Sequence, residues 1–399
     1  MILSRFVKTA AFALPLLAIT LISAGCNGGG PAPSGIVIGE YGAMTGEEAT
    51  FGTSTDKGVQ MAITEANAKG GVNGEKVAVK LYDDQGIPDQ AKTVVTKLIQ
   101  QDGVCAVIGE VASSNSLQAA PECQKSKVPM ITPASTNAKV TQQGDYIFRT
   151  CFIDPFQGGV MASFAMHNLK AKTAAVLTDS SQDYSKGLAA AFKATFTKMG
   201  GKIVADEAYG KGALDYHSQL STIKAANPDV LFVPGYYNNV GAIGRTARSV
   251  GVKVPLLGGD GWDSDKLFEG AAGSLEGCYF SNHYSIQNTD PKVQAFVAQY
   301  KKDNAGESPD AMAALGYDAT RILLAALAKA GKPADGSYTS DAYRAKLRDA
   351  IAATKDFDGV TGKITLGADR NAIKPAVVLE IKGNERKYVS TVKPEEIPT

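Results

Sequence analysis

Short apolar runs alternate with longer segments of helical periodicity along the chain from residue 35 onward. The first run, residues 36–39, leads through a glycine-containing turn to residues 53–68, where apolar side chains recur at three- and four-residue spacing. A second strand and helix are predicted at 77–82 and 88–101. Strands that alternate with helices in this way are typical of α/β folds with parallel sheets.

Two turns in the first half of the chain are rich in hydroxyl side chains. A strand at 106–109 runs into a helix that begins near Ser113, and a strand at 128–132 ends close to Ser135 and Thr136. Free N–H groups and the positive end of a helix dipole, together with serine hydroxyls, suit a carboxylate or another small anion. The alternative is that these residues only cap the helix or shape the turns.

A second series of strands and helices follows a change in pattern near residue 149. Strands are predicted at 173–178, 202–207, 229–233 and 255–259, and the last of them runs into Asp260. Two successive α/β series predict two lobes. The carboxyl ends of their strands would face a shared crevice, which is where open α/β sheets bind ligands.

The remaining chain is predicted to cross between these lobes, which gives three crossings in all. Residues 278–281 begin a return to the first lobe, and residues 357–362 cross back to the second. We therefore assign 35–149 plus 284–356 to lobe 1 and 150–283 plus 357–399 to lobe 2. The expected fold class is α/β, with two Rossmann-like lobes joined by a three-segment hinge that closes around a ligand.

The first 26 residues are predicted to direct export, and residues 27–34 to form a tether. Arg5 and Lys8 precede an apolar run at 10–21, which is too short and wrongly flanked for a membrane span. Residues 21–26 resemble a bacterial lipoprotein cleavage box. We therefore predict a signal peptide over 1–26, lipidation at Cys26, a flexible Gly/Pro/Ser tether over 27–34, and a location in the periplasm or at the cell surface. An ordinary secreted protein is the alternative.

Composition narrows the possible partners and cofactors. The 399 residues carry a formal net charge of +1 without a cluster of Lys and Arg, so no nucleic-acid partner is expected. No Cys-x-x-Cys occurs and the three histidines are far apart in sequence, so we expect no metal site and no cofactor.

Four cysteines remain besides Cys26, and export would permit disulfides between them. We favour Cys105 with Cys123, because they bracket one strand–helix unit, and Cys151 with Cys278, because both sit at candidate crossings. Four buried free thiols are the alternative.

Motifs of common enzyme classes are missing from the sequence. No Gly-x-Ser-x-Gly occurs, no histidine is expected in a matching strand-end position, and no Gly-Lys-Ser/Thr phosphate loop is present. We therefore predict a binding protein rather than an enzyme.

Several segments occur in the same order in one family: 42–46, the turn at 108–114, 131–136, 148–150 and 258–262. With them the chain resembles, from residue 35 to its end, the leucine/isoleucine/valine-binding proteins that feed ABC transporters. The resemblance implies the type I periplasmic-binding fold, no catalysis, and an ABC permease and ATPase as partners. It also implies a monomer that contacts the membrane only through its lipid anchor.

The resemblance further implies a set of ligand-binding residues. Ser113 and Thr136 would hold the ligand carboxylate, assisted by the backbone around Val111 and Ser135, and Asp260 stands where the family keeps an acid for the ligand ammonium. Aromatic walls would come from Tyr184, Tyr236, Phe51 and Trp262. Tyr237 competes with Tyr236, and each aromatic residue could instead serve packing. Branched-chain or other aliphatic L-amino acids are the expected ligands; a ligand sensor, or a site for an amide, urea or aromatic acid, is the alternative.

Overall fold

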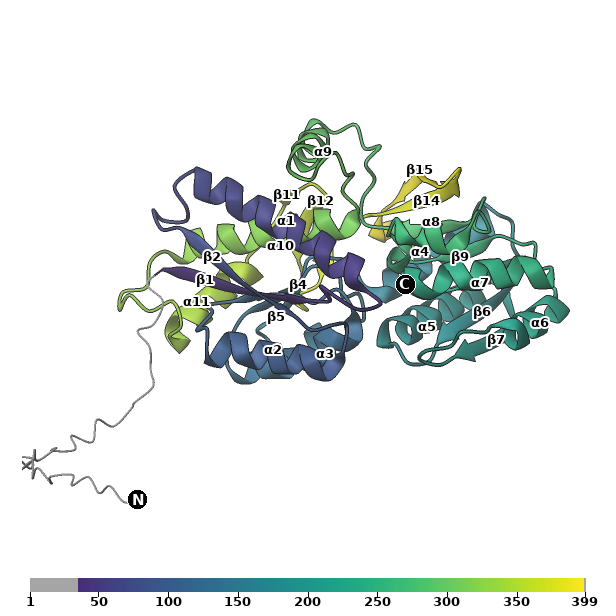
Figure 1. The fold of residues 1–399 in the computed structure, drawn as a ribbon, viewed down its shortest axis with the longest axis horizontal. Helices are drawn as coiled ribbons and strands as arrows, with labels where there is room; N and C mark the ends of the chain where they lie inside the picture. The colour runs from purple at the N-terminus through teal and green to yellow at the C-terminus, as the bar shows by residue number, and fades with distance from the viewer. Residues whose placement is uncertain (1–34, 398–399) are drawn as a thin grey trace, which may run out of the picture. The chain divides into compact units, whose positions relative to one another are not determined.

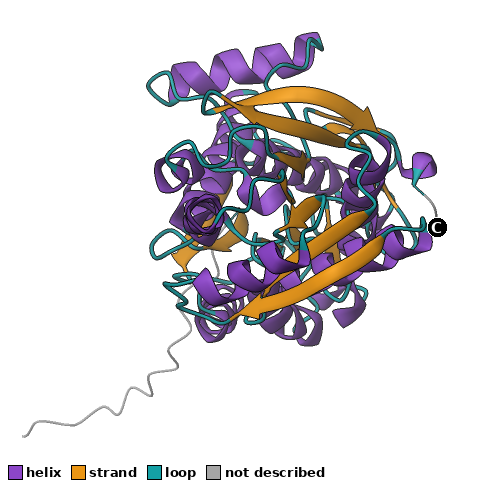
Figure 2. Cartoon of the chain, turned by 90° about the vertical axis from the view of Figure 1, so that its right-hand side faces the viewer, coloured by secondary structure: helices purple, strands orange, loops and turns teal. Residues whose placement is uncertain are grey.

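The computed structural model describes residues 35–397, and the predicted signal peptide, Cys26 and the tether lie outside them. Two main sheets, each flanked by helices, organise this part of the chain (Figures 1 and 2). The α/β fold class with mostly parallel sheets is therefore confirmed.

The first sheet has five parallel strands in the order β2-β1-β3-β4-β5. Side chains alternate across it: Ile36 and Ile38 of β1 face one helical layer, and Val37 faces the other. On the Ile36 side, α1 packs closely against α10. Gly58 permits this approach, since a Cβ at that position would lie 2.0 Å from Ala313 O. Its elements are β1 (Ile36–Gly42), α1 (Ala49–Ala68), β2 (Val77–Asp83), α2 (Pro88–Gln100), β3 (Val107–Ile108), α3 (Ser113–Lys125), β4 (Met130–Thr132), η1 (Thr141–Gln143) and β5 (Ile147–Arg149).

The second sheet has seven strands in the order β15-β14-β10-β9-β8-β6-β7. All of its strands run in the same direction except β14, which pairs antiparallel with both β10 and β15. Phe192 and Phe232 stack in its core with ring centroids 4.1 Å apart. Its elements begin with α4 (Asp154–His167), β6 (Thr173–Asp179), α5 (Asp183–Lys198), β7 (Lys202–Tyr209), α6 (His217–Ala226), β8 (Val230–Phe232), α7 (Tyr237–Val250), β9 (Leu256–Gly258), η2 (Asp260–Trp262), α8 (Lys266–Ala271) and β10 (Tyr279–Asn282).

The last part of the chain returns to the first sheet before it joins the second. Ile364 and Leu366 belong to the same core as Ile36, whereas Ala376 and Val378 belong to the core of the seven-stranded sheet. The third passage between the sheets thus lies between β13 and β14. The elements are α9 (Pro291–Asp303), α10 (Ala311–Ala330), α11 (Asp341–Ala352), β11 (Phe357–Gly359), β12 (Gly362–Leu366), β13 (Ala372–Ile373), β14 (Ala376–Lys382), β15 (Glu385–Val392) and η3 (Pro394–Glu396).

This packing divides the segment 357–399, which the sequence analysis assigns as a whole to the second lobe. Residues 357–373 lie with the first sheet, and residues from 376 onward lie with the second. Alternating apolar residues in short strands indicate which side chains are buried, but not which core receives them. The other two passages follow β5 and β10.

The predicted disulfides are wrong: all four cysteines between residues 35 and 397 are buried free thiols. Cys105 belongs to the core on one face of the five-stranded sheet, and Cys123 to the core on the opposite face. Cys151 donates to Ser135 O at 3.4 Å, and Cys278 accepts from Leu256 N at 3.3 Å. Burial raises the pKa of Cys105 to about 12, so this thiol stays protonated and unreactive.

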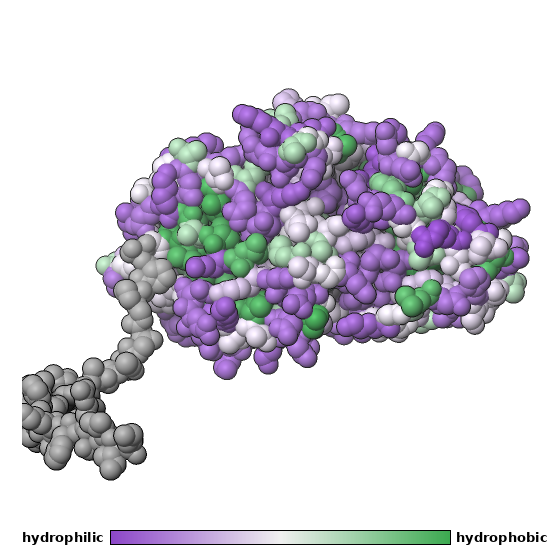
Figure 3. Space-filling model, viewed as in Figure 1, coloured by the Kyte–Doolittle hydropathy of each residue, from purple (hydrophilic) through white to green (hydrophobic). Residues whose placement is uncertain are grey.

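One described helix, α10, is long and apolar enough to cross a membrane. Of its most apolar stretch, 83% is buried inside the fold, as in a core helix. The visible face in Figure 3 is mostly hydrophilic with small separate apolar patches. Among the described residues, the large apolar side chains that are exposed are Leu81, Ile87, Leu214, Ile286, Ile373, Tyr388 and Val389.

Candidate ligand-binding site

The turn after β3 is fixed by a buried carboxyl group, that of Glu110. Ala43 N donates to its Oε1 at 3.2 Å, and Ala112 N donates to its Oε2. Burial raises the pKa of Glu110 well above its ordinary value, with Asp84 as the next cause. The turn therefore packs on the end of β1, and α3 begins directly after it at Ser113. The first N–H groups of a helix have no intrahelical partner and remain available to a ligand.

The turn after β4 is built on a buried arginine at the end of β5. Arg149 donates through Nη1 to Ser135 O at 2.6 Å and through Nη2 to Asn137 O at 2.9 Å. Asn137 N in turn donates to Ser113 Oγ at 3.2 Å. Arg149 thereby brings the second turn against the first, with Thr136 fully buried between these contacts. We call residues 109–116 and 132–138 the hydroxyl turns.

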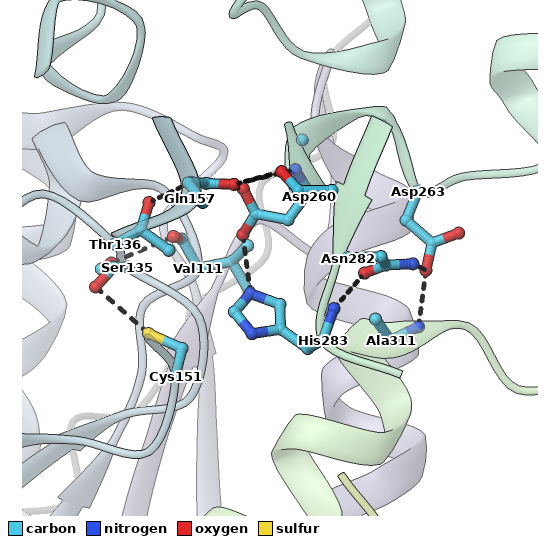
Figure 4. A network of polar contacts seen from close by, with 12 residues as sticks. Val111, Ser135, Thr136, Cys151, Gln157, Asp260, Asp263, Asn282, His283 and Ala311 are labelled. Carbon is cyan, nitrogen blue, oxygen red and sulfur yellow. Dashed lines mark hydrogen bonds and ion pairs between the residues drawn. The ribbon is translucent and has the colours of Figure 1, made fainter. Parts of the chain in front are cut away.

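Asp260 begins η2 just after β9, and three side chains donate to its carboxylate; Figure 4 shows two of them, Gln157 and His283. Tyr184 Oη and Gln157 Nε2 donate to Oδ1 at 2.9 and 3.0 Å, and His283 Nε2 donates to Oδ2 at 2.9 Å. Gln157 Nε2 also reaches Thr136 Oγ1 at 3.4 Å, so one amide connects Asp260 to the hydroxyl turns. We call Asp260, Tyr184, Gln157 and His283 the Asp260 cluster.

Glycines beside Asp260 make this arrangement possible. A Cβ at Gly259 would lie 2.5 Å from Tyr184 Oη, and a Cβ at Gly261 would lie 2.7 Å from Cδ1 of Tyr236. Both approaches are closer than carbon and oxygen atoms tolerate, so any larger residue would push an aromatic side chain away. The Gly-Asp-Gly sequence thus lets the two tyrosines approach the carboxylate.

Aromatic side chains pack beside the cluster. Tyr184 and Tyr236 stack with centroids 4.8 Å apart, and Phe51 meets the edge of Tyr236 at 5.4 Å. Tyr237 Oη donates to Glu47 O at 3.0 Å, whereas Tyr236 Oη has no partner within the described residues. Tyr236 is therefore the residue of this pair with a hydroxyl still available.

Direct hydrogen bonds join the hydroxyl turns to the seven-stranded half. Asp183 N donates to Ser114 Oγ at 2.9 Å, and Asn137 Nδ2 donates to Asp183 O at 2.7 Å. A polar cavity of about 530 Å³ adjoins these contacts and includes Glu48 in its lining. Glu48 is buried, not solvated: burial, then Asp84, raises its pKa to about 8, so it is mostly neutral at pH 7.

The structure places all nine predicted ligand-binding residues in buried positions. Two of them are engaged inside the fold: Trp262 packs on Gly258 and donates to Val233 O, and Ser135 Oγ donates to Glu110 O and Val111 O. The structure brings the others together: Ser113, Thr136, Val111, Asp260, Tyr184, Tyr236 and Phe51.

Sequence reasoning missed Gln157, Arg149, Glu110 and His283. Gln157 carries no local signal, and although Glu110 and Arg149 lie in segments shared with the family, their roles depend on contacts distant in sequence. His283 could have been found, because it directly follows β10. No group of three or more metal-ligating side chains lies within residues 35–397.

Two α/β sheets with three passages between them, and a polar site where the strand ends meet, define a solute-binding protein of the type I periplasmic class. A family model described as "Periplasmic binding protein" matches residues 35–386. The chain belongs to this family, and membership implies an extracytoplasmic location.

Individual relatives agree with this assignment. The chain is similar to the crystal structure of a leucine binding protein, LivK, from Thermotoga maritima, with 38% identity, a TM-score of 0.84, and coverage of 91% of this chain and 100% of that one. LivJ from Streptococcus pneumoniae, a branched-chain amino acid transporter substrate binding protein in complex with isoleucine, gives 32% identity, a TM-score of 0.81, and coverage of 89% and 99%. The Leu/Ile/Val-binding protein BraC3 of Rhizobium johnstonii is 31% identical over 84% of this chain and 88% of its own length. These relatives are named as binding proteins, not enzymes.

Proposed function

We propose that the chain is the extracytoplasmic solute-binding component of an ABC transporter and binds branched-chain or other aliphatic L-amino acids between its two sheets. One observation carries this proposal. The hydroxyl turns, with the start of α3, lie within one hydrogen-bonded network of the carboxylate of Asp260, with Gln157 between them. An anion-binding group and a cation-binding group at opposite ends of one small site suit a zwitterion.

The ligand carboxylate would be held by the hydroxyl turns. Ser113 begins α3, so N–H groups and a helix dipole are directed at this end, and Asn137, the residue after Thr136, donates through its N–H to Ser113 Oγ. Burying a carboxylate without such donors would cost several kcal/mol, as would burying an unpaired ammonium group. The neutral state of Glu48 avoids an additional negative charge near this end at pH 7.

The ligand ammonium would be held by Asp260. Each carboxylate oxygen accepts two hydrogen bonds readily. Oδ1 already accepts from Tyr184 and Gln157, whereas among residues 35–397 His283 alone donates to Oδ2. Oδ2 therefore keeps an acceptor position for a ligand N–H. The shorter aspartate side chain is compensated by the glycines, which let its partners approach.

The ligand side chain would lie against the stacked tyrosines and Phe51. An aromatic wall suits aliphatic groups, and discrimination between leucine, isoleucine and valine amounts to only about 1–3 kcal/mol per methylene. The names of LivK, LivJ and BraC3 support this ligand class. An amide, urea or an aromatic acid lacks the zwitterion and would leave one end of the site unpaired.

Closure and delivery complete the proposal. Because the two charge partners of the ligand come from different sheets, ligand favours the closed arrangement that satisfies both. We propose two lobes with a three-segment hinge, a monomer that delivers ligand to a permease and ATPase, and a lipid anchor at Cys26. A ligand sensor with the same site is the second candidate; neighbouring permease and ATPase genes would favour uptake, whereas a signalling gene would favour sensing.

Calorimetry on ligand-stripped protein tests the ligand class. We expect saturable heat with leucine, isoleucine, valine or alanine at one site per chain. Heat with an amide, urea or benzoate, together with none from these amino acids, would contradict the assignment. For the anchor, mass spectrometry of membrane-extracted protein should find a lipidated Cys26 as the first residue; cleavage at another bond would contradict it.

A further inference from the structure

The second passage between the sheets is directly connected to Asp260. His283 follows β10, its side chain is fully buried, and its Nε2 lies 2.9 Å from Asp260 Oδ2. Asn282, the preceding residue, donates through Nδ2 to Asp263 Oδ2 at 2.9 Å. Asp263 Oδ2 also accepts from Ala311 N at 2.7 Å, at the start of α10. Figure 4 shows this network from Asp260 to α10.

The first passage contacts the second at the same point. The Phe152 ring, which follows β5, stacks on the imidazole of His283 with centroids 3.7 Å apart and an interplanar angle of 22°. Both side chains are almost completely excluded from solvent. The imidazole is thus held between Phe152 and Asp260, where two of the three inter-sheet passages meet the proposed ammonium site.

We propose that His283 is a positioning residue: its Nε2–H fixes Asp260 for the ligand ammonium and couples that contact to the inter-sheet passages, so that protonation of His283 weakens ligand binding. This inference rests on the proposed amino-acid site. His283 does not itself contact the ligand and acts through Asp260.

The geometry favours the neutral imidazole in the working state. Nε2 donates to a carboxylate, and Nδ1 has no hydrogen-bond partner among residues 35–397. The neutral tautomer with its proton on Nε2 satisfies both observations, whereas a second proton would place an N–H on Nδ1 without an acceptor. It would also place a positive charge beside Asp260, where it would compete with the ligand ammonium.

The groups around the imidazole shift the pKa of His283 in opposite directions. Burial lowers the pKa of His283, and Asp260 opposes this; Lys374 on the third passage adds to the lowering, and Asp263 opposes it. His283 is therefore neutral at pH 7 and gains a proton only in more acidic solution. Asp154 also lies near Asp260, and burial raises its pKa to about 7, so it titrates in a neighbouring range and needs its own control.

Calorimetry with L-leucine between pH 5 and pH 8 tests the inference. For the wild type we expect a Kd that is constant near pH 7.5 and rises at least threefold toward pH 5. His283→Phe keeps a flat ring but lacks the donor, so its Kd at pH 7.5 should rise tenfold or more. His283→Gln keeps an N–H donor that does not titrate, so its Kd at pH 7.5 should stay within about threefold of the wild type. Its Kd should also rise less than that of the wild type between pH 7.5 and pH 5, a rise that we call the acid limb.

Three outcomes would overturn the inference: wild-type affinity in His283→Phe, an unchanged acid limb in His283→Gln, or loss of that limb in Asp154→Asn alone. If the wild type binds no aliphatic amino acid, the proposed function fails and this inference fails with it. Wild-type binding with unaffected His283 variants refutes this inference only.

Nuclear magnetic resonance of the imidazole C–H groups in the wild type avoids any folding defect of the variants. The chain has only three histidines, and His167 and His217 lie outside this network. Saturating L-leucine should move the titration of His283 to lower pH and leave the other two unchanged. Identical His283 titrations with and without L-leucine would overturn the inference.

Discussion

The hydroxyl turns and the Asp260 cluster supply opposite ends of the proposed site, but they are built differently. The hydroxyl turns are short loops at neighbouring strand ends of one sheet, and buried Glu110 and Arg149 hold them through backbone groups. The Asp260 cluster instead holds one carboxylate with side chains from α4, α5 and the passage after β10. Sequence motifs therefore indicate the first region more completely than the second.

The largest expected effect is a loss of stability when Arg149, which supports the hydroxyl turns, is replaced. Arg149→Met removes the guanidinium donors to the buried carbonyl oxygens of Ser135 and Asn137, which are left with the Cys151 thiol and Val140 N–H as donors, and each such loss costs about 1–3 kcal/mol. We expect the free energy of unfolding in urea to fall by about 3 kcal/mol. Arg348→Met is the matched control, because Arg348 pairs with Asp145 and Asp349 and lies over the Tyr146 ring near the surface, and its loss should cost less than about 1 kcal/mol. Equal losses in the two variants would show that Arg149 does not support the turns.

The next largest effect is a loss of affinity for leucine when the Asp260 cluster loses its charge. Asp260→Asn removes the negative charge opposite the ligand ammonium and should weaken leucine binding by about 2 kcal/mol, or about 30-fold. Asp265→Asn removes a carboxylate of the same type from an exposed position five residues away and should leave the Kd unchanged. Calorimetry at pH 7.5 distinguishes the two, and an unaltered Kd in Asp260→Asn would place the ammonium elsewhere.

A smaller loss is expected when one hydroxyl of the turns is removed. Ser113→Ala keeps the N–H groups at the start of α3, so it should weaken leucine binding by about 1 kcal/mol, less than Asp260→Asn. Thr93→Ala, which removes an exposed hydroxyl from α2, serves as the control. If Ser113→Ala weakened binding more than Asp260→Asn, the ranking of the two regions would be reversed.

The smallest effect is a change in how stability depends on pH when Glu48, near the hydroxyl turns, is replaced. The pKa of Glu48 is about 8 in the folded chain and near its ordinary value of 4.5 when unfolded, because burial disfavours the charged form. The folded state then binds more protons between these values, so stability falls as pH rises through this window. Glu48→Gln should remove part of this slope and stabilise the protein, relative to wild type, by at least about 1 kcal/mol more at pH 8 than at pH 5. Urea unfolding at both pH values with identical slopes would contradict a buried, neutral Glu48.

Local signals predicted the α/β class and most elements, because hydrophobic periodicity and strand-end turns are short-range properties. The hydroxyl-rich turns pointed to Ser113 and Thr136, whereas the family resemblance, not a local signal, placed Asp260 in one site with them. Gln157 and Arg149 could not be assigned roles, because those roles arise from contacts with residues remote in sequence. The position of His283 after a strand could be recognised, but its pairing with Asp260 could not. The disulfide prediction failed for the same reason. Cys105 and Cys123 are close in sequence, but the fold places them on opposite faces of one sheet.

The central claim is that one site binds a zwitterion at both ends, and the pairing of ligand ammonium with Asp260 tests it most directly. Calorimetry of wild type and Asp260→Asn with L-leucine and with 4-methylpentanoate, which lacks the ammonium group, measures this pairing. Removing the ammonium should cost the wild type at least tenfold more affinity than it costs the variant. Equal losses in the two proteins would contradict the claim.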